Sequence, residues 1–390
     1  MPKRILICNP YVSLGGIGSF TLSLGAGLKN KGDKVYLIAT HFKGDLWNEA
    51  INVFDEAMTV ASHESPIFRL LKIVKLIALI KPDTVIINDC PLVNYSLPLI
   101  SRKIKSISII HSDHRRYYSL GSRFSGWIDK IVCPSPKLGK QLLQYLPEAD
   151  HNKIVVIPHG VKLSVTINFQ EKIKNTIIFI GNLGEHKGVN LLPKILGMVV
   201  NEIKDASFTV IGKGPLKDWL INEIEVKELG SKFHYISELD KQGIYKKLAE
   251  TEVMLLPTRL ESFGLVIPES MANGAIPVIS NLEDITDQFV KNEENGFLCD
   301  KDNPSAFAER IITILKNEDL KKQLSESAIR VARDKFSEER MIQDYHSIIE
   351  SEEHKENPIF LSPRWVGLII RDFLRIINTA FQRNEHPVCR

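Results

Sequence analysis

The chain has 390 residues, of which 44% are hydrophobic and 25% charged, and its formal net charge is +3. This length and composition indicate a soluble globular protein with room for two separate cores. The longest apolar helical stretch, residues 67–80, contains Arg69, Lys72 and Lys75, so no segment reaches the roughly 18–20 apolar residues that a membrane span needs.

Charge is unevenly distributed along the chain. Residues 1–165 hold 21 Lys and Arg against 12 Asp and Glu, whereas residues 166–354 hold 23 against 32. Basic clusters at residues 102–105 and 115–116 would suit an anionic membrane surface, where each nearby cation contributes about 1 kcal/mol. A solvated basic face explains them equally well. Nucleic acid is not an expected partner, because no binding motif or aromatic stripe accompanies the charges.

Five cysteines, Cys8, Cys90, Cys133, Cys299 and Cys389, are scattered without metal-ligand spacing. This usage indicates a reducing compartment. The first residues lead directly into a predicted strand, so we expect no signal peptide and a cytoplasmic protein.

Short apolar runs alternate with helical patterns through the first part of the chain. Runs rich in Val and Ile are typical of buried parallel strands, and the intervening helices predict a doubly wound α/β sheet. The predicted strands are residues 5–8, 35–39, 84–87, 107–110, 131–133 and 154–157.

A second set of strands is predicted at residues 176–180, 208–211, 233–236, 253–256 and 276–279. We therefore expect an α/β protein with two Rossmann-like doubly wound parallel-sheet domains that face each other across a cleft. The predicted domains are residues 1–165 and 166–336, followed by a closing helix at 337–350 and a linker with a tail helix at 351–390.

Ligands of doubly wound sheets bind beyond the carboxyl ends of the strands, so the residues after each strand are candidates for a site. After the first strand, Gly15 and Gly16 form a loop whose amides could approach a phosphate or an acceptor closely. His111 follows the fourth strand, although a lone histidine is more often structural than catalytic. Ser135 and Lys137, after the fifth strand, are candidates for the acceptor side.

Two further loops follow strands of the second predicted domain. The first runs from Gly181 to Gly188 and contains Asn182 and Lys187, a long flexible cation close to the next helix. The second contains Gly212 in the sequence Gly-Lys-Gly-Pro. A surface lysine or a glycine turn is common in proteins, so these loops alone identify no site.

The stretch of residues 257–280 carries the strongest functional signal. A glycine turn after a buried strand leads into a short helix, where Pro268 is tolerated in the first turn. Glu261 precedes the helix start and Glu269 follows it, so the two carboxylates could bracket a phosphate held by free amides. Their spacing alone would leave two solvated surface carboxylates as the commoner explanation.

The residues around these carboxylates resemble the Glu-x7-Glu signature of the retaining glycosyltransferases of family 4. The residues that match are Glu261, Phe263, Gly264, Leu265, Glu269, Met271, Ala272, Gly274, Pro277 and Val278. The glycine loop after the first strand, the element at 181–188 and the turn at 212–215 are also similar to elements of this family. The resemblance implies the GT-B architecture.

The resemblance also implies a role for each candidate residue. Glu261 would bind hydroxyls of the transferred sugar, Glu269 the ribose hydroxyls and Lys187 the donor diphosphate, while His111 would contact the sugar near its anomeric carbon. Further donor contacts are implied for Gly15, Gly16, Asn182, Gly212, Ser262, Phe263, Gly264 and Leu265.

Asn182 departs from the family pattern, because an arginine usually stands at this place. The departure removes one of two expected diphosphate cations. Phosphate binding would then depend on Lys187, on the helix start at residues 264–265, or on a neighbour such as Arg259.

The mechanism implied by the resemblance is front-face transfer with retention, in which the departing phosphate accepts the acceptor's proton. The protein would supply orientation and charge stabilisation. No metal or other cofactor is expected, because Lys187 and helix amides would hold the diphosphate. Asp300 and Asp302 form an Asp-x-Asp pair, which we interpret as a polar turn.

Residues 363–383 are predicted to form an amphipathic helix that begins after Ser362 with Pro363. A wide apolar face with arginines opposite suits a helix lying in an anionic membrane surface. Packing on its own domain or on a second subunit is an equal alternative.

The leading hypothesis is a retaining hexosyl- or related glycosyltransferase that is either free in the cytoplasm or peripheral on the inner face of a membrane. It would transfer sugar from a nucleotide-sugar donor to a growing lipid-linked glycan in polysaccharide or glycolipid synthesis. The alternatives are a sugar-nucleotide epimerase of the same fold and a non-catalytic nucleotide-sugar-binding scaffold, which the Asn182 departure allows.

Overall fold

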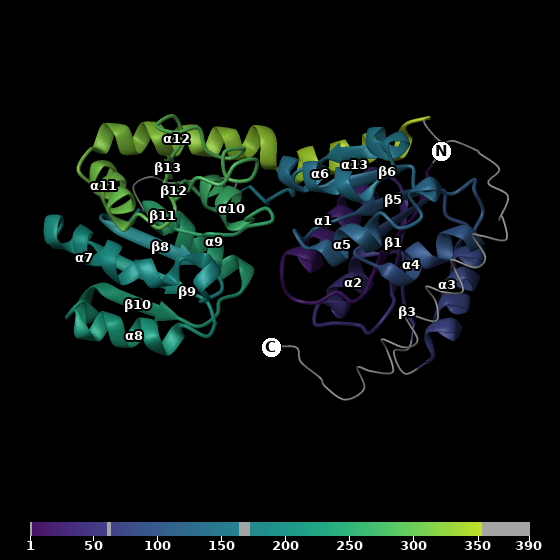
Figure 1. Ribbon diagram of the computed structural model, residues 1–390, viewed down its shortest axis with the longest axis horizontal. Coiled ribbons are helices and arrows are strands. Elements are labelled where there is room, and N and C mark those ends of the chain that lie inside the picture. The colour runs from purple at the N-terminus through teal and green to yellow at the C-terminus, as the bar shows by residue number, and fades with distance from the viewer. Residues whose placement is uncertain (1, 61–63, 164–171, 353–390) are drawn as a thin grey trace. The chain divides into compact units, whose positions relative to one another are not determined.

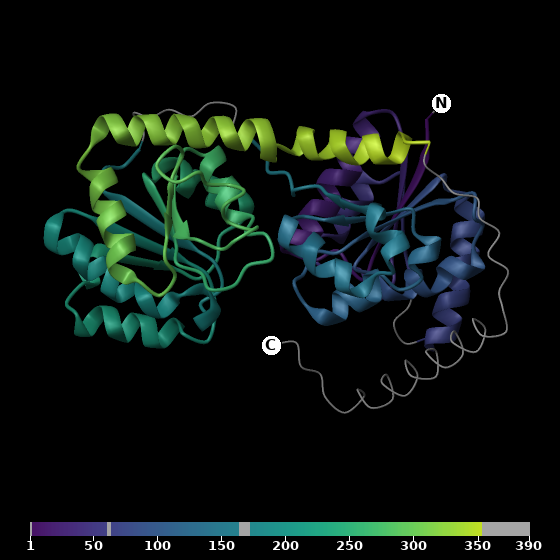
Figure 2. The same cartoon turned by 45° about the horizontal axis from the view of Figure 1, so that its top comes forward.

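The computed structural model describes residues 2–60, 64–163 and 172–352. These residues form two compact units, each built on a parallel sheet with helices on both faces (Figure 1, Figure 2). The predicted α/β architecture with two Rossmann-like sheets is therefore confirmed. The predicted tail helix at residues 363–383 lies outside the described residues.

The first unit, called unit 1, contains a 7-stranded sheet in the order β3-β2-β1-β4-β5-β6-β7. Its described residues lie within Met1–Cys133, Gly139–Val156 and Asp344–Arg390. Its strands are β1 (Arg4–Asn9), β2 (Lys34–Ala39), β3 (Glu56–Thr59), β4 (Thr84–Asn88), β5 (Lys105–Ile109), β6 (Lys130–Cys133) and β7 (Ile154–Val156). Its helices include α1 (Gly16–Asn30), α2 (Trp47–Val53), α3 (Pro66–Ile80), α4 (Pro91–Ser96) and α5 (Arg115–Gly121).

The second unit, called unit 2, contains a 6-stranded sheet in the order β10-β9-β8-β11-β12-β13 and comprises Pro134–Leu138 and Ile157–Gln343. Its strands are β8 (Thr176–Ile180), β9 (Ser207–Ile211), β10 (Phe233–Ile236), β11 (Val253–Leu256), β12 (Ile276–Ser280) and β13 (Phe297–Cys299). Its helices are α7 (Leu192–Glu202), α8 (Lys217–Val226), α9 (Lys241–Glu250), α10 (Val266–Ala272), α11 (Pro304–Leu315) and α12 (Glu318–Phe336). Two helices, α6 (Pro136–Leu142) and α13 (Glu338–Glu350), contain residues of both units.

The central strands form because their Val and Ile side chains are buried on both faces of the sheet. Every residue of β4, β5, β11 and β12 is buried. Since parallel strands end at the same edge, the loops after β1, β4 and β5 meet in unit 1, and those after β8, β9 and β11 meet in unit 2.

Helix α3 has well-defined ends. Ser65 precedes it and its hydroxyl accepts a hydrogen bond from the amide of Phe68 at 3.4 Å, while Pro66 occupies the first turn. Lys81 ends the helix with a left-handed φ of 49°.

The end of α13 is fastened to unit 1. Lys105 is 6% exposed, and its ammonium donates to the carbonyl oxygens of Ile348 and Ile349 at 3.0 and 3.1 Å, and also to that of Ser351. Tyr345 is buried, with its ring 5.6 Å from that of Phe20 in α1. The last turn of α13 is therefore part of the unit 1 core.

None of the helices in the described ranges combines the length and the apolar character needed to span a bilayer. The four cysteines among these residues, Cys8, Cys90, Cys133 and Cys299, are free and buried.

Candidate functional site

An ion pair between Lys187 and Glu261 lies at the carboxyl edge of the unit 2 sheet. Glu261 follows β11 and is 7% exposed, and Lys187 ends a short 3-10 helix, Glu185–Lys187, in the loop after β8. The two loops are joined by Thr258, whose hydroxyl donates to the carbonyl of His186 at 3.1 Å. The structure thus brings together two predicted site residues that are 74 positions apart.

Two glycines allow the loops of this edge to approach each other closely. Gly188 has a φ of +70°, and a Cβ at this position would lie 1.9 Å from the carbonyl oxygen of Pro257. A Cβ on Gly212 would lie 1.9 Å from the carbonyl oxygen of Gly181. The backbone after β8, β9 and β11 is therefore packed without room for side chains at these points.

Glu269 lies in the first turn of α10 and is half-buried. Burial raises the pKa of its carboxyl to about 7, although the Lys241 ammonium and the Tyr245 hydroxyl act in the opposite direction. Lys241 itself lies over the Tyr245 ring at 5.6 Å. Glu269 can therefore be either protonated or ionised near neutral pH.

The segment between the two carboxylates turns its aromatic residue inward. Phe263 is 4% exposed, and its ring packs edge-on against His159 and Phe289 at 5.0 Å from each. Gly264 has a φ of +90° and redirects the chain toward α10, which Leu265 precedes as the N-cap residue. The ring of Phe263 thus belongs to the core of unit 2.

Ser135 and Lys137, predicted on the acceptor side of the first domain, pack with unit 2. Ser135 is fully buried, and its hydroxyl donates to the carbonyl of Ser262 at 3.0 Å. The amide of Lys137 donates to the carbonyl of Asp284 at 3.4 Å. The structure therefore places Ser135 beside the segment of Glu261.

Arg259 was one of the expected substitutes for the arginine missing at Asn182, but it is engaged elsewhere. Its guanidinium forms an ion pair with Asp302 at 2.6 Å and donates to the side chain of Asn190 at 3.0 Å. Asn182 is exposed. Among residues 2–60, 64–163 and 172–352, no group of three or more His, Cys, Asp or Glu is arranged to hold a metal ion.

His111 lies in unit 1 within a buried polar network that the sequence did not predict. Its Nε2 contacts the side-chain oxygen of Asn88, whose amide nitrogen donates to Thr21 at 2.8 Å and to Asn9 at 3.2 Å. Because the Asn88 nitrogen is the donor to both, its oxygen must accept from an Nε2–H of His111. The network fixes the ring at the carboxyl ends of β1, β4 and β5.

A cavity of about 860 Å³ lies beside this network in unit 1. Gly15, with a φ of +124°, and Gly16, which begins α1, form part of its wall. Other lining residues are aromatic, aliphatic or charged, among them Tyr11, Leu14, His41, Arg69, Asp89, Leu92, Tyr95, Arg116 and Tyr117.

Three titratable residues of this cavity, Arg69, His41 and Asp89, are partly or fully buried. Arg69 is 8% exposed; its guanidinium donates to the carbonyl of Thr40, while its Nε is buried without a hydrogen-bond partner. Burial, and then the charge of Arg69, lower the pKa of His41 to about 4. Burial raises the pKa of Asp89 to about 7, with the His111 backbone amide acting against it. Sequence analysis missed these residues, and only the position of Asp89 directly after a strand could have indicated one of them.

The predicted site residues are thus divided between the units. Gly15, Gly16 and His111 lie in unit 1, whereas the other predicted donor and catalytic residues lie in unit 2.

Two family models match adjoining parts of the chain. The model described as Glycosyltransferase Family 4 matches residues 14–165, and the one described as Glycosyl transferases group 1 matches residues 166–331.

Individual relatives are more distant. An uncharacterised glycosyltransferase of Methanocaldococcus jannaschii is 30% identical over 224 residues, which are 57% of this chain and 59% of that protein. The N-acetyl-alpha-D-glucosaminyl L-malate synthase of Bacillus anthracis is 22% identical over 369 residues, covering 87% of this chain and 94% of the synthase. The crystal structure of Anabaena HepE in complex with UDP and glucose has a TM-score of 0.74 at 14% identity, covering 90% of this chain and 100% of HepE. At this identity the likeness to HepE concerns the fold, which is GT-B.

Proposed function

Because this chain belongs to the group 1 glycosyltransferases of the family 4 type, we propose that it is a retaining enzyme with a nucleotide-sugar donor. It would transfer the sugar to a growing glycan acceptor by front-face displacement. The observation that carries the proposal is the Lys187–Glu261 ion pair at the carboxyl edge of unit 2.

The ion pair holds a cation that could bind the donor diphosphate next to an anion that could bind the donor sugar. On binding, the Lys187 ammonium would turn to the diphosphate oxygens, and the Glu261 carboxylate would accept hydrogen bonds from sugar hydroxyls. Since each charge compensates the other before the donor arrives, the pair is held in place without a ligand. HepE, a structural neighbour, has been crystallised with UDP and glucose, which supports a nucleotide-sugar donor.

Glu269 and the loop at Gly212 would hold the nucleoside. Burial raises the pKa of the Glu269 carboxyl in the absence of a donor. Hydrogen bonds from ribose hydroxyls would stabilise its ionised form and lower this pKa again. We therefore expect Glu269 to be ionised in the complex. Lys187 and the backbone amides of the glycine loops would hold the diphosphate without a metal ion.

Retention would follow from front-face attack, in which the acceptor hydroxyl approaches the anomeric carbon on the side from which the phosphate departs. Glu261, paired with Lys187, would bind the sugar rather than attack it, and the leaving phosphate would accept the proton of the acceptor hydroxyl. The product anomer, determined by NMR, tests this directly: a product of the opposite anomeric configuration to the donor would exclude the retaining mechanism.

The acceptor would enter the cavity of unit 1, whose aromatic walls suit sugar rings.

We further propose that the acceptor is lipid-linked and that residues 363–383 hold the protein at an anionic membrane surface. Deleting residues 358–390 should then reduce flotation with anionic vesicles. Unchanged flotation would exclude the tail as the anchor.

The proposed activity is tested with a panel of UDP-, GDP- and ADP-sugars by measuring release of free nucleotide. Glu261→Gln should lower kcat/KM by about 100-fold or more, because a contact to the reacting sugar is lost. Glu202→Gln, which removes an exposed carboxylate paired with Lys316, is the matched control and should leave activity unchanged. Nucleotide binding without turnover would indicate a scaffold, and an epimerised nucleotide sugar would indicate an epimerase.

A further inference from the structure

Helix α3 is apolar on its outer as well as its inner side. The inner residues Leu70, Ile73, Ile77 and Ile80 are buried in unit 1. The outer residues are large and exposed: Ile67 42%, Phe68 68%, Leu71 54% and Leu79 66%. Several large apolar side chains exposed together on one helix face form the kind of surface that binds a partner.

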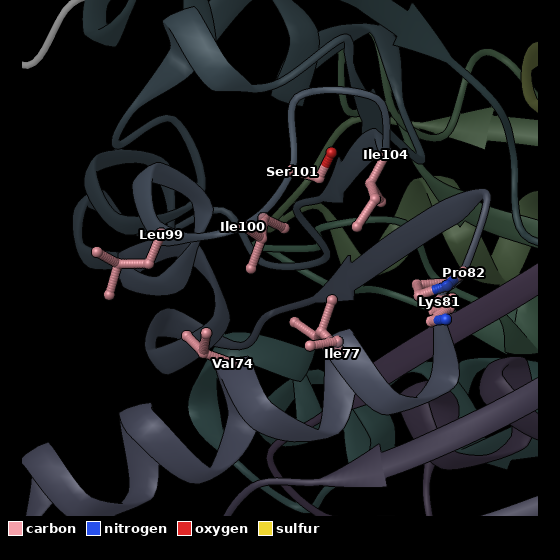
Figure 3. Close-up of a pocket in the computed structure, with 9 residues that line it drawn as sticks. Val74, Ile77, Lys81, Pro82, Leu99, Ile100, Ser101 and Ile104 are labelled. Carbon is pink, nitrogen blue, oxygen red and sulfur yellow. The ribbon is translucent and has the colours of Figure 1, made fainter.

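An apolar cavity of about 340 Å³ adjoins this face. Figure 3 shows Val74 and Ile77 pointing from the helix toward the segment that carries Ile100 and Ile104. Leu99, which is 48% exposed, belongs to the same lining. The cavity therefore continues the exposed apolar surface of α3 inward.

Most of the charges around this surface are positive, although exposed Asp83 follows the cavity residue Pro82. Residues 66–80 contain no Asp or Glu. Lys75 is exposed on α3, Lys81 is exposed at its end and contributes to the cavity, and Lys103 is exposed next to the cavity residues. Lys72 adds no net charge here, because its ammonium is paired with the Glu64 carboxylate at 3.3 Å. Apolar side chains surrounded by lysines complement a surface that is apolar within and anionic outside.

We propose that this surface, the α3 patch (Ile67, Phe68, Leu71, Leu79 and Leu99 with Lys75, Lys81 and Lys103), docks on an anionic lipid bilayer. The apolar side chains enter the interface, one acyl chain occupies the cavity, and the three lysines approach lipid phosphates. At 15 residues α3 is too short to span the bilayer and lies along it.

A second copy of this chain fits the α3 patch less well. A symmetric dimer through the patch would bring its lysines toward those of the partner, and like charges repel in such an interface. A bilayer presents phosphates and acyl chains together, so it satisfies both parts of the patch at once.

The test is flotation of the full-length chain with vesicles of equal parts phosphatidylcholine and phosphatidylglycerol. The triple variant Phe68→Gln, Leu71→Gln, Leu79→Gln should lower the bound-to-free ratio at least about tenfold, because three apolar side chains no longer leave water. The matched control replaces three exposed apolar residues of unit 2, Met198→Gln, Trp219→Gln and Val226→Gln, and should change the ratio less than about twofold. Circular dichroism confirms that both variants fold.

A second variant tests the charges. Lys75→Gln, Lys81→Gln, Lys103→Gln should lower the ratio at least about tenfold on the anionic vesicles and leave weak binding to pure phosphatidylcholine vesicles unchanged. Flotation needs neither donor nor acceptor, so this result is independent of glycosyl transfer.

Unchanged flotation of the apolar triple variant overturns the proposal. If the variant then also loses a dimer in light scattering, the α3 patch is assigned to a second copy. If residues 358–390 are instead cleaved faster by a protease, the patch is assigned to the chain's own C-terminal segment.

Discussion

At the scale of single residues, Glu261 and Glu269 lie close in sequence but in different electrostatic surroundings. Glu261 is bonded to the Lys187 ammonium. Glu269 has the Tyr245 hydroxyl and Lys241 nearby, yet burial dominates and raises its pKa to about 7. Glu269 should therefore change its charge across the neutral pH range.

Glu269 should make the stability of unit 2 depend on pH. Its ordinary pKa is 4.5, so between pH 4.5 and 7 the folded state binds a proton that the unfolded chain releases. The contribution to the free energy of unfolding is complete below pH 4.5 and is lost as the pH rises through 7. Glu269→Gln should thus gain up to about 3 kcal/mol relative to wild type between pH 5 and 8.

This pH dependence is measured by urea unfolding of the wild type and of Glu269→Gln at pH 5 and pH 8. Glu294→Gln, at an exposed position, serves as the control and should follow the wild type. Equal differences between wild type and Glu269→Gln at the two pH values would contradict the prediction.

Site residues that belong to a sequence motif could be predicted from the sequence. Side-chain pairings that depend on how distant loops or strands pack could not. Lys187 and Glu261 were both predicted, and the structure shows them paired. Arg259 was considered for the diphosphate, but its pairing with Asp302, 43 residues away, depends on how two loops pack. Asn88 likewise became a partner of His111 only through the strand order β1-β4-β5.

At the scale of elements, Gly188 determines how the loop after β8 meets the loop after β11. Gly188→Ala would place a Cβ 1.9 Å from the Pro257 carbonyl at a left-handed φ, so a loop must shift. We expect it to cost at least about 2 kcal/mol of stability and to displace Lys187. Gly230→Ala is the control, because a Cβ there meets nothing within 4 Å. Equal unfolding midpoints for the two variants would exclude this role of Gly188.

The cap that Lys105 forms on α13 gives a second prediction at this scale. Lys105→Met removes the buried ammonium that donates to the carbonyls of Ile348, Ile349 and Ser351. Lys3 still donates to the Ile349 carbonyl and the Ser351 hydroxyl to that of Ile348, so we expect a cost of about 1–2 kcal/mol. Amide hydrogen exchange in residues 344–350 should accelerate. Lys103→Met, at an exposed position, should leave it unchanged; if both variants exchange alike, the cap contributes nothing.

Elements could be predicted where their pattern was local. The buried strands were found because runs of Val and Ile are typical of them. The edge strand β3, Glu56–Thr59, was missed because it lacks such a run and forms by pairing with β2. Helix α1 begins at Gly16, directly after the predicted glycine loop, with the Ser19 amide donating to the carbonyl of Gly15 at 3.1 Å. The predicted closing helix corresponds to α13.

At the scale of the whole molecule, two units with separate cores should respond differently to a nucleotide. If the donor binds mainly through Lys187, Gly212 and Glu269, a nucleotide at about a hundred times its Kd adds about 2.7 kcal/mol to the unfolding of unit 2. Calorimetry with UDP, GDP and ADP in turn measures this shift. Lys187→Ala should weaken it, and a shift confined to unit 1 would contradict the assignment of the donor site.

The attachment of the α13 end to Lys105 and Phe20 has a consequence for recombination of this gene with those of relatives. A single crossover after Val156 would join one parent's first sheet to the other parent's final helical turn. The core around Tyr345 would then be assembled from side chains that did not evolve together. Functional chimeras should therefore need a second crossover near Asp344, which returns the last turn to the sheet it completes.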